Sequence, residues 1–211
     1  MYPDEPMLGT RTQLDNDEKG KPVFGDYTWK SFAEVQKIGQ AIGRGIEVLK
    51  LATETEGDGK KWQFVGVWAK NRREWLETHI GNMYFNRTTI GFFDSMGNQA
   101  VDFILNQTEL SCIFCTPEYI SKLVAMKKED LAKSIKYLVS MERVKPEQVE
   151  ACKAVGVELL ELSYVIEKGL ASTIEFNKCK ADDCPIFSYT SGTTGDSKGV
   201  KLTHANLIAS A

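Results

Sequence analysis

The feature that most constrains the fold is an alternation between short apolar runs and segments with helical periodicity. The apolar runs cover residues 64–69, 88–93, 111–116, 135–140 and 157–162. Helices are expected between them, after Asn71, around residues 99–106, after Pro117 and from Pro146. Asn71 and Glu74 are expected to cap the first of these helices. The run 64–69 is apolar throughout, which is typical of a strand covered on both faces. The alternation predicts an α/β fold with a mainly parallel sheet and helices on both faces, in which ligands bind outside the carboxyl ends of the strands.

The first helix is expected ahead of this alternation. Ser31 and Glu34 form a Ser-x-x-Glu capping box, and apolar residues then recur at helical spacing to about Lys50. Three glycines interrupt this helix, each costing about 1 kcal/mol relative to alanine. They fit either a close backbone approach on that side or simple tolerance, and the sequence does not separate the two (Gly39, Gly43, Gly45).

Composition excludes several classes of function. The 211 residues are 42% hydrophobic, which suffices for one domain or two small lobes. With 26 basic and 29 acidic residues, the net charge of −3 gives no basic field for nucleic acid or anionic lipid, so no nucleic-acid partner is expected. No apolar run approaches the roughly 18 residues of a membrane span, and residues 1–7 do not resemble a signal peptide. We therefore expect a cytoplasmic protein.

Two sets of chemically versatile side chains have simpler interpretations. Cys112-x-x-Cys115 has the spacing of a redox or zinc motif, but it lies in an expected buried strand, where residues three apart point to opposite faces. A second pair at metal spacing is lacking, so core thiols are the preferred interpretation. His79 has no Asp or Cys partner near it in sequence and is expected to be a packing residue.

The stretch Ser188–Gly199 carries the strongest functional signal. It follows a short apolar strand beginning at Ile186, and it is rich in hydroxyl side chains and glycines. Hydroxyls donate hydrogen bonds, glycines allow backbone N–H groups to point into a concavity, and Lys198 adds a positive charge. Such a set of donors suits a polyphosphate. The alternative is a solvated linker, which shares this composition but not this order of residues.

Two well-known phosphate loops do not match this stretch. The Walker pattern needs Gly-Lys-Ser/Thr at its end, whereas Lys198 follows a serine and precedes a glycine. The dinucleotide pattern Gly-x-Gly-x-x-Gly fails as well, because the glycines are at 192, 195 and 199.

The stretch instead resembles the signature Tyr-Thr-Ser-Gly-Thr-Thr-Gly-x-Pro-Lys-Gly of the AMP-forming acyl-adenylating enzymes. Ser197 departs from it, since it stands where that family has proline. Further stretches resemble the long-chain fatty acid–CoA ligase branch of the family, and together they span most of the chain. They are Leu8–Arg11 with Tyr27–Val35, Val65–Trp75, and Phe93–Gly97 leading into Phe103–Glu109.

This resemblance implies a two-step reaction. A long-chain fatty acid carboxylate attacks the α-phosphate of ATP, which gives acyl-AMP and pyrophosphate, and the thiolate of coenzyme A then displaces AMP. Carried over residue by residue, the groups that would hold the β- and γ-phosphates are Thr190, Ser191, Gly192, Thr193, Thr194, Gly195 and Lys198, with the Thr190 hydroxyl near Mg²⁺. Ser197 is expected to leave the loop looser than proline would.

The resemblance also sets an expected domain organisation. Residues 1–25 are polar and are expected to be an extended or loose segment, and residues 26–211 to be an incomplete amino-terminal AMP-binding domain. By the family pattern the adenine pocket, the ribose-binding aspartate, the magnesium glutamate and the carboxyl-terminal domain with its lysine lie further along. No catalytic residue is therefore expected within these residues, and no acyl-CoA formation by them alone.

Three hypotheses remain open. The preferred one is the amino-terminal part of a long-chain fatty acid–CoA ligase. The second is another acyl-adenylating enzyme, such as an aryl-CoA ligase or a luciferase relative, and the third is a non-catalytic module that binds a nucleotide or a partner protein. Acyl chain length, oligomeric state and peripheral contact with the cytosolic face of a membrane are left undetermined.

Overall fold

A computed structural model describes residues 2–190 and 198–210. Its largest unit is a sheet with the strand order β10-β9-β5-β4-β6-β7-β8, to which β3 adds by pairing with β4. The path from β9 to β8 is parallel throughout, whereas β10 and β3 are antiparallel to their neighbours. The strands are β3 Glu54–Gly57, β4 Lys60–Trp68, β5 Thr88–Phe92, β6 Cys112–Cys115, β7 Tyr137–Ser140, β8 Glu158–Glu161, β9 Ile186–Thr190 and β10 Lys198–Leu202.

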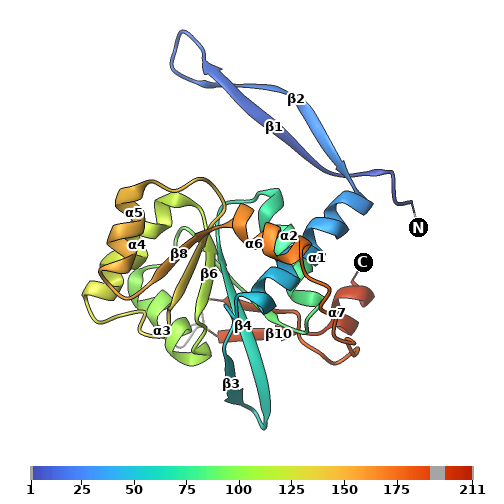
Figure 1. The fold of residues 1–211 in the computed structure, drawn as a ribbon, viewed down its shortest axis with the longest axis vertical. Coiled ribbons are helices and arrows are strands. Elements are labelled where there is room, and N and C mark those ends of the chain that lie inside the picture. The colour runs from blue at the N-terminus through green and yellow to red at the C-terminus, as the bar shows by residue number, and fades with distance from the viewer. Residues whose placement is uncertain (1, 191–197, 211) are drawn as a thin grey trace.

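Helices cover both faces of this sheet (Figure 1). One core cluster joins one face to α3, α4 and α5, and a second joins the opposite face to α1 and α6. The helices are α1 Phe32–Val48, α2 Arg73–Met83, α3 Asn98–Thr108, α4 Pro117–Lys128, α5 Pro146–Lys153, α6 Leu162–Leu170 and α7 His204–Ala209. The predicted α/β class with a mainly parallel sheet is confirmed. Within the described part of the chain, no helix has both the length and the apolar character needed to cross a bilayer.

The glycines of α1 mark a close approach of helices. Ser31 caps this helix in the predicted capping box with Glu34. A Cβ added at Gly43 would lie 2.5 Å from the carbonyl oxygen of Gly81 in α2, and one at Gly45 would lie 2.1 Å from that of Val165 in α6. Because backbone atoms occupy those places, the close-approach interpretation holds and simple tolerance does not.

The amino-terminal segment is a paired ribbon. Strands β1 Pro6–Asn16 and β2 Pro22–Ser31 form an antiparallel pair that projects from the rest of the fold (Figure 1). The Arg11 guanidinium bridges the pair by donating to the carbonyl oxygens of Phe24 and Gly25. The segment is extended, as expected, but it is paired rather than loose. Residues 22–25 share a strand with Tyr27, and the division of the chain after residue 25 stays a prediction.

One helix cap was predicted wrongly, and the buried thiols were predicted correctly. The expected cap of α2 at Asn71 is wrong, because Arg72 occupies the N-cap position and makes no side-chain capping bond. The expectation for the thiols is confirmed: Cys112 and Cys115 are both buried, and they pack in the two core clusters on opposite faces of the sheet. These two sulfurs therefore cannot converge on one ion, and burial raises the pKa of both thiols.

Candidate functional site: the β9–β10 turn

The register of β9 and β10 brings the two ends of the predicted phosphate loop together. Thr190 and Lys198 are directly opposite each other in the antiparallel pair, at the carboxyl end of β9. Residues directly opposite in such a pair have their side chains on the same face of the sheet. A hydroxyl and an ammonium therefore flank the turn that contains the rest of the signature, and both residues are exposed.

The remaining predicted phosphate ligands lie outside the described residues. They are Ser191, Gly192, Thr193, Thr194 and Gly195, and the same holds for Ser197, the departure from the signature. Their roles, and those of Thr190 and Lys198 as phosphate and magnesium ligands, stay predictions.

Tyr189 holds this pair of strands against the body of the protein. Its ring is buried, and its hydroxyl donates a hydrogen bond of 2.7 Å to Oε1 of Gln107 in α3. Gly199 lies opposite Tyr189, and a Cβ there would be 3.1 Å from the ring carbon Cζ. A side chain at position 199 would therefore crowd the Tyr189 ring, which would have to shift by a few tenths of an ångström to accommodate it. Burial raises the pKa of Tyr189 to about 12, so its hydroxyl stays protonated at neutral pH.

Alternation along the strands separates two faces of the β9–β10 pair. Phe187 and Tyr189 face the core cluster of α3, with Lys201 opposite Phe187. Since side chains alternate along a strand, Thr190 and Lys198 face the other side. The two lysines of β10 at positions 198 and 201 therefore point in opposite directions, and only Lys198 shares a face with Thr190.

His79 has a structural role, as expected from the sequence. Its Nδ1 lies 2.9 Å from the hydroxyl oxygen of Thr89, to which Asn82 also donates a hydrogen bond. The Thr89 hydroxyl has both a proton and a second lone pair, so it pairs with either tautomer of a neutral imidazole. Burial, together with the charge of His204, lowers the pKa of His79 to about 4. His204 begins α7, where the capping bonds are made by its neighbour Thr203.

Comparison with known proteins identifies the family. Residues 11–211 match the AMP-binding enzyme family, and this range contains the whole β9–β10 turn. The chain belongs to the AMP-binding enzyme family.

The hydrogen bond between Tyr189 and Gln107 could not be found from the sequence. The two residues are 82 positions apart, and no local sequence pattern connects them.

Curated relatives of this family member include long-chain acyl-CoA synthetases. The chain is 31% identical to the peroxisomal long chain acyl-CoA synthetase 7 of Arabidopsis thaliana over 208 residues, which are 99% of this chain and 27% of the relative. It is 29% identical to the human long-chain-fatty-acid–CoA ligase 1 over 184 residues, 87% of this chain and 26% of the relative. The chain thus spans about a quarter of the length of these relatives.

Solved structures support the same fold. The adenylation domain of a carboxylate reductase from Mycobacterium chelonae superposes with a TM-score of 0.72 at 18% identity, covering 99% of this chain and 33% of that one. A didomain of the carboxylic acid reductase from Segniliparus rugosus, solved in complex with AMP, gives a TM-score of 0.71 at 19% identity, covering 98% and 31%. At these identities the likeness concerns the fold alone.

Proposed function

We propose that this chain supplies the ATP phosphate-binding turn of an AMP-forming long-chain fatty acid–CoA ligase. Membership of the AMP-binding enzyme family and relatives that carry this name support the reaction class. The observation that carries the proposal for the site is the pairing of Thr190 with Lys198 at the two ends of the Ser/Thr/Gly segment.

In the proposed reaction, a carboxylate oxygen of the fatty acid attacks the α-phosphorus of ATP. The bond from that phosphorus to the oxygen bridging to the β-phosphate breaks, and pyrophosphate leaves with the electron pair. The thiolate of coenzyme A then attacks the acyl carbon and releases AMP. Charge accumulates on the leaving pyrophosphate, and a preorganised set of donors stabilises such charge.

The proposed role of the turn is to hold that leaving group. The Lys198 ammonium would neutralise the β- and γ-phosphates together with the hydroxyls and backbone N–H groups of Ser191, Gly192, Thr193, Thr194 and Gly195. The Thr190 hydroxyl is a hard oxygen donor at the exposed end of β9, which fits a place beside Mg²⁺. When bound, Mg²⁺ would neutralise phosphate charge.

The test uses the complete product of the gene with ATP, Mg²⁺, palmitate and coenzyme A. The nucleotide product is identified by chromatography, and reactions without palmitate serve as controls. The proposal expects AMP and palmitoyl-CoA in equal amounts, both dependent on palmitate. Release of ADP would exclude acyl adenylation, and AMP formation with aryl acids but not with palmitate would favour a different acyl-adenylating enzyme.

A further inference from the structure

Part of the β9–β10 pair extends past the parallel ladder of the sheet. The pairing of β9 with β5 ends at Phe187, which lies opposite Ile90, and β10 pairs only with β9 among the described residues. Residues 188–190 of β9 and residues 198–200 of β10 lie opposite each other beyond that point. We call these two segments the overhang. Because the overhang lacks a strand partner on its β5 side, other contacts must fix its position against the rest of the protein.

Tyr189, the middle residue of the β9 segment, packs the overhang onto the body of the protein. Its ring is only 5% exposed and belongs to the core cluster that includes α3. Gly199 brings the β10 segment against the same ring, since a Cβ at that position would lie 3.1 Å from Cζ and 3.4 Å from the hydroxyl oxygen. Both strands of the overhang therefore rest on one side chain.

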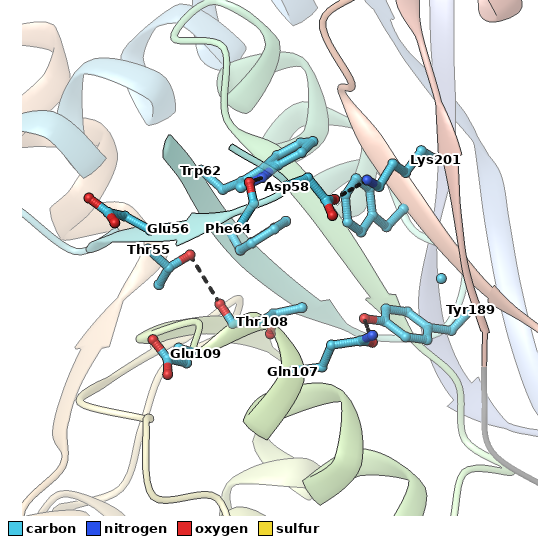
Figure 2. Close-up of a pocket in the computed structure, with 13 residues that line it drawn as sticks. Thr55, Glu56, Asp58, Trp62, Phe64, Gln107, Thr108, Glu109, Tyr189 and Lys201 are labelled. Atoms are coloured by element: carbon cyan, nitrogen blue, oxygen red, sulfur yellow. Dashed lines mark hydrogen bonds and ion pairs between the residues drawn. The ribbon is translucent and has the colours of Figure 1, made fainter. Parts of the chain in front are cut away.

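The tyrosine hydroxyl is held in place from α3. It donates a hydrogen bond of 2.7 Å to Oε1 of Gln107, and Figure 2 shows the two side chains meeting from β9 and α3. Gln107 is the penultimate residue of α3, and the nearby residues Leu105 and Thr108 are buried. The core therefore fixes the backbone of Gln107, whereas its side chain is exposed and acts through the hydrogen bond.

The two groups proposed to contact phosphate are attached directly to this contact. Thr190 follows Tyr189 in β9, and Lys198 precedes Gly199 in β10. If the acceptor on Gln107 is lost, the hydroxyl of a buried ring is left without a partner among the described residues, and the ring is expected to turn toward water. Because both strands rest on the ring, such a movement displaces both ends of the turn. A displacement of about 1 Å is enough to slow catalysis strongly.

We propose that Gln107 is a positioning residue for the phosphate turn, which it aligns through Tyr189 without contacting ATP. The proposal rests on the proposed function, since it assigns the turn to the phosphates. It separates the two half-reactions: adenylation requires pyrophosphate to be held and released, whereas transfer of the acyl group to coenzyme A involves no pyrophosphate. Loss of the hydrogen bond should therefore slow the first half-reaction and leave the second unchanged.

Three variants of the complete gene product isolate the hydrogen bond. Gln107→Leu removes the acceptor at similar size, and Gln107→Glu keeps an acceptor oxygen at the same reach. Gln36→Leu is the matched control, because Gln36 is also an exposed helical glutamine that bonds to a tyrosine, with its amide 2.9 Å from the hydroxyl of Tyr84. That hydrogen bond joins α1 to the C-cap of α2 rather than holding β9.

Two half-reactions and one structural property are measured for each variant. Palmitate-dependent exchange of radiolabelled pyrophosphate into ATP reports adenylation, and palmitoyl-CoA formation from supplied palmitoyl-AMP and coenzyme A reports acyl transfer. Amide hydrogen exchange, followed by mass spectrometry on peptides that cover residues 186–190 and 198–202, reports the opening of the β9–β10 pair independently of the reaction.

Gln107→Leu is expected to lower kcat/KM for ATP in the exchange reaction about threefold to tenfold, the range that corresponds to one neutral hydrogen bond. Acyl transfer from palmitoyl-AMP should stay within about twofold of wild type. Amide exchange of the β9–β10 peptides should be about threefold to tenfold faster. Gln107→Glu should stay within about twofold of wild type in all three measurements, and so should Gln36→Leu.

Any of four results would overturn the proposal. They are an ATP kcat/KM within about twofold of wild type in Gln107→Leu, an equal loss in both half-reactions, unchanged amide exchange of the β9–β10 peptides, or a Gln107→Glu variant as impaired as Gln107→Leu. A wild-type protein without palmitate-dependent exchange would contradict the proposed function instead. Amide exchange in Gln107→Leu then still decides whether the hydrogen bond positions the overhang.

Discussion

Replacing Lys198 with methionine removes one charge from the β9–β10 turn and keeps an unbranched side chain. Lys198 is exposed at the first position of β10, opposite Thr190, and no ion pair involves it among the described residues. The fold should therefore be insensitive to the loss of the ammonium. Any loss of activity would report on what the ammonium contacts in the complex with ATP.

The size of the effect follows from the proposed contact. A charge-assisted hydrogen bond to a phosphate oxygen contributes about 1.5–3 kcal/mol. If Lys198 makes one such bond to the leaving pyrophosphate, kcat/KM for ATP should fall about tenfold to a hundredfold. The melting temperature should change by less than about 2 °C, because surface substitutions of this kind usually cost within roughly 0.5 kcal/mol.

Initial rates of palmitate-dependent AMP formation at varied ATP measure this, and Lys201→Met is the matched control. Lys201 lies three positions along the same strand but faces the opposite side of the sheet, where it pairs with Asp58. The control should keep kcat/KM for ATP within about twofold. If Lys198→Met is also within about twofold, or if both variants lose activity equally, the assignment of Lys198 to the phosphates is wrong.

Three further predictions concern stability. Burial lowers the pKa of His79 from 6.5 to about 4, so the free energy of unfolding should fall by about 3 kcal/mol as the pH drops through that interval. In His79→Gln, the free energy of unfolding measured with denaturant should depend less on pH over the same interval. Tyr189→Phe deletes the bond to Gln107 and should cost about 0.5–1.5 kcal/mol in urea unfolding. With the pKa of Tyr189 raised from 10.0 to about 12, wild-type stability should fall as the pH rises through that range, and less so in Tyr189→Phe. Gly169→Ala would place a Cβ 1.7 Å from the carbonyl oxygen of Ala41, so calorimetry should show a melting temperature lower by several degrees. An unchanged melting temperature would contradict the packing of α6 against α1.

The sheet could be predicted because its strands are covered on both faces. Val65 and Val67 of β4 pack in one core cluster while Phe64 and Trp68 pack in the other, so residues 64–68 carry no polar side chain. A run of that kind is hard to mistake for a loop. Each strand that was inferred this way is present with bounds shifted by at most a few residues.

Elements without that signal were missed. The ribbon β1–β2 has little buried surface, and its strands carry neither an apolar run nor a clear alternation. Its pairing depends on contacts between distant positions, such as Arg11 with the carbonyl oxygens of Phe24 and Gly25. Helix α6 was also missed, since its nine residues follow directly on β8 with no connecting residue between the two elements.

The site was predictable in part for a similar reason. The order of residues in the signature marks the segment, because the glycines and hydroxyls that are predicted to bind phosphate lie together in the sequence. The position of Tyr189 against Gln107, and the separation of Lys198 from Lys201 on two faces, depend on strand register and helix packing. Such tertiary relations are not encoded in a local pattern.

The central claim is that the turn between Thr190 and Lys198 holds pyrophosphate as it leaves ATP. Exchange of radiolabelled pyrophosphate into ATP by the complete gene product, without coenzyme A, measures this half-reaction in reverse. The account predicts exchange only when palmitate is present, at a rate reduced about tenfold or more in Lys198→Met and unchanged in Lys201→Met. Exchange that is independent of palmitate, or a palmitate-dependent rate that Lys198→Met leaves intact, would contradict it.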